Sequence, residues 1–82
     1  MPLEDKRTWR LVMREIHKFP IDPSLINVSV INHVCYIGGR VRRLRNPETR
    51  GLDLKKVLAE MEEVIRGLPG IRDVVMDVLI EQ

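Results

Sequence analysis

The sequence predicts one small α+β domain in two layers, with the order helix, strand, strand, helix, strand (αββαβ) and both helices packed on one face of a three-stranded sheet. Three observations predict this fold. Apolar residues repeat at helical spacing in two segments, they alternate with other residues in three more, and proline, glycine and asparagine separate the segments. The chain has 82 residues, which suffices for a single domain over 1–82 with one modest core.

The first segment is expected to be an amphipathic helix. Its apolar residues recur three and four positions apart and form one stripe, made of Trp9, Val12, Met13 and Ile16. The helix should end near Lys18, because Pro20 disfavours the α conformation at the residue before it.

Two strands joined by a tight turn should follow. The first strand has apolar residues at every second position from Ile26 to Val30, and Asn32-His33 can form a two-residue turn because asparagine tolerates positive φ. The return strand is expected over about 34–41. Its core-facing set should comprise Cys35, Ile37, Gly39 and Val41. The inward glycine leaves room for a helix backbone to approach the sheet.

A loop over 42–52 separates the hairpin from the second helix, which Asp53 can cap. The apolar residues of this helix repeat from Leu54 to Leu68. In the last strand, one face should carry Val74, Met76, Val78 and Ile80, and the other Val75, Asp77, Leu79 and Glu81. The sequence leaves open whether this strand pairs with the first or the second.

Four stretches follow a pattern known from one family of bacterial domains: 22–25, 28–30, 35–41 and 68–74. Gly39 and Gly70 are the positions that matter most to this pattern. On these residues the chain resembles the BON domain family, over about residues 5–81. Two features depart from the pattern: His33, where the family has a turn glycine, and the longer loop over 42–52. The resemblance implies a bacterial binding module for phospholipid or small ligands, with no catalytic residues.

Residues with reactive or metal-binding side chains are few. The soft metal ligands are His17, His33 and Cys35, and the expected strand register buries Cys35 while His33 lies in a turn. The sequence therefore predicts no metal site, no cofactor and no enzyme. The first residues do not read as a secretory signal, and no segment approaches the roughly 18 apolar residues of a membrane span. We therefore expect a cytoplasmic protein.

Basic residues gather in two places, although the net charge is only +2. One cluster consists of Arg40, Arg42, Arg43, Arg45 and Arg50. The first helix adds Lys6, Arg10, Arg14 and Lys18 at every fourth position, where like charges do not stabilise a helix. Two interpretations stay open: contact with an anionic partner such as lipid headgroups, or a solvated surface whose charges pair with nearby acidic residues.

The outer face of the sheet should carry apolar side chains that the helices leave uncovered. They are Ile31, Val34, Tyr36, Val75 and Leu79. An exposed patch of this kind often marks an interface, so we expect two copies to pair through their sheets unless a terminus or the long loop covers the face.

Taken together, these features favour a non-enzymatic module that binds anionic phospholipid or another small anionic ligand and associates as a dimer. We expect Arg40, Arg42, Arg43 and Arg45 to contact the anionic partner, and the outer sheet face to associate with another copy or another protein. Nucleic-acid binding through the basic segment 40–50 is a second hypothesis, although the sheet offers only Tyr36 for base stacking. A purely structural oligomerisation domain is a third.

Overall fold

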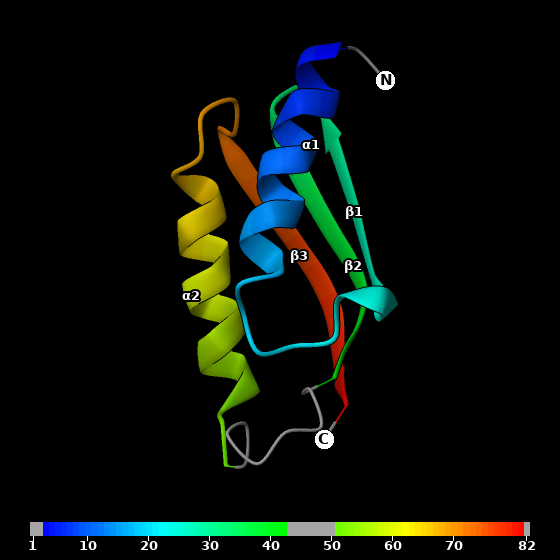
Figure 1. Cartoon of the computed structure of the whole chain (residues 1–82), viewed down its shortest axis with the longest axis vertical. Coiled ribbons are helices and arrows are strands. Elements are labelled where there is room, and N and C mark those ends of the chain that lie inside the picture. The colour runs from blue at the N-terminus through cyan, green and yellow to red at the C-terminus, as the bar shows by residue number, and fades with distance from the viewer. Residues whose placement is uncertain (1–2, 43–50, 82) are drawn as a thin grey trace.

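A computed structural model describes residues 3–42 and 51–81 of the chain (Figure 1). Its elements are α1 (Leu3–Ile16), a 3₁₀ turn η1 (Pro23–Leu25), β1 (Ile26–Ile31), β2 (Val34–Arg42), α2 (Leu54–Arg66) and β3 (Asp73–Glu81). The predicted αββαβ order is thereby confirmed, with one added turn of 3₁₀ helix before β1.

The three strands form a mixed sheet in the order β1-β2-β3. The hairpin pair β1 and β2 is antiparallel, and β3 runs parallel to β2. The pairing that the sequence left open is therefore with the second strand. Both β1 and β3 are edge strands, and the register places Tyr36 beside Val75 and Arg42 beside Glu81.

Both helices cover the same face of the sheet, as predicted (Figure 1). Helix α1 packs on β1, α2 packs on β3, and the two helices contact each other. The core lies between the layers and takes side chains from every helix and strand. Its fully buried members are Val12, Ile16, Ile21, Val30, Cys35, Ile37, Val41, Met61 and Ile65.

Helix α1 ends at Ile16, two residues earlier than expected. The amide of His17 still bonds to the carbonyl of Met13, four residues back, but the amides of Lys18 and Phe19 bond to carbonyls only three residues back. The backbone thus tightens into 3₁₀-type turns ahead of Pro20, as helix ends commonly do. Helix α2 begins as predicted, with the carboxylate of Asp53 accepting from the amide of Lys55.

The β1–β2 turn has the predicted two residues, and both Asn32 and His33 adopt positive φ. The structure also explains the histidine. Nδ1 of His33 donates to the carbonyl oxygen of Gly70 at 3.1 Å, and the His33 carbonyl accepts from the amide of Arg72 at 2.8 Å. A glycine would lack the first of these bonds, so His33 fastens the hairpin turn to the loop between α2 and β3.

Gly39 and Gly70 both have positive φ and stand against other parts of the chain. A Cβ at Gly39 would overlap the carbonyl oxygen of Leu25 and come within 3.3 Å of the Cα of Ile26. A Cβ at Gly70 would meet the hydroxyl of Thr8 at 2.5 Å. The backbone that approaches Gly39 is therefore that of η1 and β1, and not that of an α-helix as we expected.

Candidate binding surfaces

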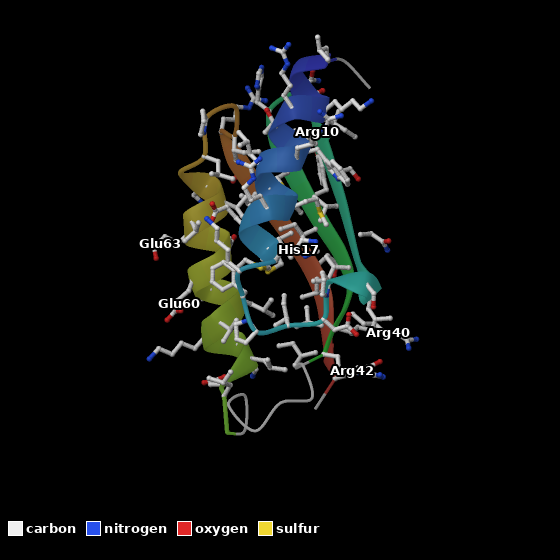
Figure 2. All side chains as sticks on the ribbon, in the orientation of Figure 1. Arg10, His17, Arg40, Arg42, Glu60 and Glu63 are labelled. Carbon is white, nitrogen blue, oxygen red and sulfur yellow. The ribbon has the colours of Figure 1, made fainter. Side chains whose placement is uncertain are left out.

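Helix α1 carries three exposed basic residues on one face, Lys6, Arg10 and Arg14, which we call the α1 basic stripe. Successive members lie four positions apart, so the stripe covers an arc of roughly 80° and about 12 Å of helix. The next basic residue of the predicted series, Lys18, lies beyond the end of the helix and pairs with Glu15 at 3.0 Å. Among the acidic side chains that the structure describes, none forms an ion pair with Lys6, Arg10 or Arg14. Figure 2 shows Arg10 near the middle of α1 and His17 just beyond its end. The stripe therefore presents three cations that have no ion-pair partner among the side chains that the structure describes.

The arginines of β2 are in a different situation, because they share one acidic partner. Arg42 holds Glu81 through two bonds, from Nε at 3.0 Å and from Nη2 at 2.6 Å, and Nη1 of Arg40 lies 3.3 Å from the same carboxylate. The hydrogen bond from Arg42 holds the pKa of Glu81 below its usual value of 4.5, and the charges of both arginines add to this effect. The other members of the predicted cluster, Arg43, Arg45 and Arg50, lie outside the described residues.

Sequence reasoning missed this ion pair because it depends on the parallel register of β2 and β3. The register places Arg42 directly beside Glu81 and Arg40 beside Leu79, with all of these side chains on the outer face. The only signal in the sequence was that Glu81 occupies an outward-facing position in the last strand. This position indicates an ion pair only when the neighbouring strand and its register are known.

The outer face of the sheet exposes the apolar side chains that the alternation placed there. Ile31 is 56% exposed, Tyr36 43%, Val75 44% and Leu79 70%, whereas Val34 is half-buried. Ile31 lies beside Val34, and Tyr36 beside Val75, so these four form one patch at one end of the sheet. Leu79 is separated from the patch by the pair Gly38–Asp77. We call the four residues the outer apolar patch.

The potential nucleophile and metal ligands do not come together. Cys35 is fully buried in the core, and burial raises the pKa of its thiol to about 11. His33 is engaged with Gly70 in the hairpin turn, and His17 is exposed at the end of α1. In the part of the chain that the structure describes, no three His, Cys, Asp or Glu residues are placed to hold a metal ion.

A shallow groove of about 330 Å³ lies between α2 and β3. Its lining consists of Lys55, Leu58, Ala59 and Glu62 from the helix, and Met76, Val78 and Ile80 from the strand. The sequence placed Leu58, Met76, Val78 and Ile80 on the core side of their elements. It could not show that β3 would be an edge strand, which leaves the groove open to solvent on one side.

Comparison with known proteins identifies no relative: no family model, no curated protein and no solved structure matches the chain. Among the described residues, no helix is long and apolar enough to cross a membrane.

Proposed function

We propose that the chain is a non-enzymatic binding module of the BON type, which contacts anionic phospholipid or another small anionic ligand through the α1 basic stripe. The observation that carries the proposal is that Lys6, Arg10 and Arg14 have no ion-pair partner among the acidic side chains that the structure describes. Like charges at this spacing cost the helix a few tenths of a kcal/mol per pair, so the arrangement disfavours the isolated helix and suits an external anion.

Two features of the fold support the assignment to the BON type. The chain has the element order that the resemblance implies. Gly39 and Gly70, the two positions that matter most to the family pattern, both have positive φ and stand where a side chain would clash.

The expected strength of binding follows from the number of cations. Each Lys or Arg near an anionic bilayer contributes about 1 kcal/mol, so the three residues supply about 3 kcal/mol, which alone corresponds to an affinity weaker than millimolar. Binding should therefore need a membrane rich in anionic lipid and low salt, or several copies acting together. Arg43, Arg45 and Arg50 are candidates for further contacts.

Co-sedimentation with vesicles tests this proposal. Vesicles of phosphatidylcholine alone and of equal parts phosphatidylcholine and phosphatidylglycerol are compared at low and high salt. The wild-type chain should bind only the anionic vesicles at low salt, and replacing the three stripe residues by Gln should abolish binding. The control removes three exposed cations elsewhere, Lys55, Lys56 and Arg72, and should retain binding. No sedimentation of the wild type at low salt would refute the proposal.

The same preparations distinguish the alternative partner. A nucleic-acid-binding module would be favoured if the chain bound random oligonucleotides in a salt-dependent way and did not bind vesicles. Replacing Arg42 and Arg43 by Gln should then abolish oligonucleotide binding.

The proposal includes self-association through the outer apolar patch. The exposure of Ile31, Tyr36 and Val75 on one side of the sheet is the supporting observation. Replacing Ile31 and Val75 together by Lys should shift the solution mass from dimer to monomer, whereas Leu3→Lys, at an exposed apolar position on α1, should leave it unchanged. A wild-type chain that stays monomeric at hundreds of micromolar would rule out this part of the proposal.

A further inference from the structure

The two edges of the sheet are not equivalent. At the edge strand β1, Nε1 of Trp9 from α1 donates to the carbonyl oxygen of Val28 at 3.0 Å. At the opposite edge, the amide of Val74 bonds to the carboxylate of Asp73, but no described residue outside the sheet forms a hydrogen bond with the backbone of residues 75–81. With respect to the described residues, strand β3 thus presents a backbone edge that is open over most of its length.

The helix layer extends beyond this open edge. In Figure 1, β3 crosses behind α1, and α2 lies on the side of β3 that is away from β2. Two helices side by side are about 20 Å wide, whereas three strands span only about 14 Å. The sheet is therefore about one strand narrower than the layer that covers it, and the groove lies where a fourth strand would run.

The groove has the lining that an added strand needs. Its floor is apolar, because Met76, Val78 and Ile80 of β3 face the helix layer and are only half-buried, with Leu58 and Ala59 of α2 opposite them. A strand paired to β3 would direct every second side chain into this space. Those side chains should therefore be apolar.

A second copy of β3 is a poor occupant of the site. Antiparallel pairing about the midpoint of β3 would place Asp77 beside Asp77 of the other copy, and like charges directly opposite each other are unfavourable. It would also place the α2 helices of both copies in the same space above the sheet. They would clash, because packed helices need about 8–10 Å between their axes.

The charge on the outer side of β3 indicates the partner. Three acidic residues point outward from β3, and two already have cationic partners: Asp73 pairs with Arg66 at 3.0 Å and Glu81 with Arg42. Asp77, between them, is exposed and has no ion pair with any described residue. An added strand would place a side chain beside Asp77, and a Lys or Arg there would be the favourable neighbour.

We propose that the open edge of β3 and the groove under α2 form a docking site for an extended peptide segment, which adds to the sheet as a fourth strand. The segment carries apolar side chains at alternate positions facing the groove and at least one Lys or Arg on the other side, beside Asp77. This mode of recognition takes affinity from main-chain hydrogen bonds and specificity from the alternate side chains. It is independent of the α1 basic stripe and of the outer apolar patch.

Fluorescence anisotropy with two synthetic peptides tests the proposal. The probe is the labelled peptide Lys-Val-Thr-Val-Lys-Val-Thr-Val-Lys, and its counterpart has Glu in place of each Lys. The wild-type chain should bind the basic peptide saturably and the acidic one more weakly. Asp77→Lys should weaken binding of the basic peptide about two- to fivefold and strengthen binding of the acidic one.

The groove is tested with a second variant. Ala59 is exposed on α2 and lines the groove, so Ala59→Glu should abolish binding without disturbing the core. Lys56→Glu, a charge change on the same helix outside the groove, should bind the basic peptide within about twofold of the wild type, and circular dichroism checks the fold of each variant. Hydrogen exchange should show slowed exchange at alternate amides of residues 75–81 when the peptide is bound.

Three results would overturn the proposal. The first is no saturable binding at millimolar peptide. The second is binding that Ala59→Glu leaves intact or that protects amides outside β3, which would place the peptide elsewhere. The third is protection of the β3 amides in the wild-type chain without peptide, if that protection increases with protein concentration. This result would show that a second copy of the chain occupies the site.

Discussion

Replacing Gly39 by alanine tests the closest packing in the fold. Gly39 has a φ of +100°, and its Cα hydrogens lie against the backbone of Leu25 and Ile26, where η1 joins β1. An alanine there meets two obstacles at once. The positive φ is strained for any residue with a Cβ, and the Cβ itself would sit closer than 3.0 Å to a carbonyl oxygen, so the backbone has to move.

The size of the effect follows from these two costs. Strain at an unfavourable φ costs about 1–3 kcal/mol, and moving Leu25 away disturbs the end of the β1–β2 ladder, which costs about 0.5–1.5 kcal/mol. Alanine also lowers the conformational entropy of the unfolded chain relative to glycine, which offsets about 0.4–1 kcal/mol of the destabilisation. The net loss lies between about 0.5 and 4 kcal/mol, with a central value of about 2 kcal/mol. A domain of this size has about 4–12 kcal/mol of stability in total, so the loss is a large fraction of it.

Urea unfolding followed by circular dichroism measures the difference, with Gly38→Ala as the matched control. A Cβ at Gly38 would lie 3.6 Å from the carbonyl oxygen of Asp77, an ordinary contact, so this variant should be unchanged or up to about 1 kcal/mol more stable. Gly39→Ala should lower the urea midpoint by about 1–2 M. Equal stabilities for the two variants would show that Leu25 does not pack against Gly39 and would refute the reasoning.

Three further results are expected. Trp9→Phe removes the hydrogen bond to the Val28 carbonyl and should cost about 1–2 kcal/mol in thermal unfolding; an unchanged midpoint would contradict a role for that bond. Because Arg42 holds the pKa of Glu81 below 4.5 in the folded chain, stability should fall as the pH drops below 4.5, and Glu81→Gln should flatten that part of the profile relative to Glu63→Gln. Cys35, buried and with a pKa of about 11, should react with a thiol reagent at pH 8 only as fast as the chain opens, and rapid labelling of the native protein would show that the thiol is accessible.

The elements of the fold could be predicted because hydrophobic periodicity is local. In β3, the alternation put Val74, Met76, Val78 and Ile80 on the core side, and the structure places them there. The spacing in α2 is equally regular, and its cap at Asp53 follows from the residue type alone. Such patterns need no knowledge of the strand partner.

The relations between elements could not be predicted in the same way. The ion pair of Glu81 with Arg40 and Arg42 depends on a parallel register between strands that are separated by a helix. The bond from His33 to Gly70 joins two turns that are 37 residues apart. The burial of Asp5 and Thr8 on the inner side of α1 also went unforeseen, since polar residues are ordinarily assigned to the solvent side. Each depends on tertiary packing and not on a local repeat.

The placement of both helices on one face has a consequence for the way copies would act together. Both helices lie on one face of the sheet (Figure 1), so the α1 basic stripe belongs to the helix layer, whereas the outer apolar patch lies on the opposite face of the sheet. Two copies joined back to back through the patch would direct their stripes away from each other, so one flat membrane could touch only one of them. Such a pair is a cross-linker: it would draw separate vesicles into clusters and raise the turbidity of the suspension, whereas a single copy would only coat them.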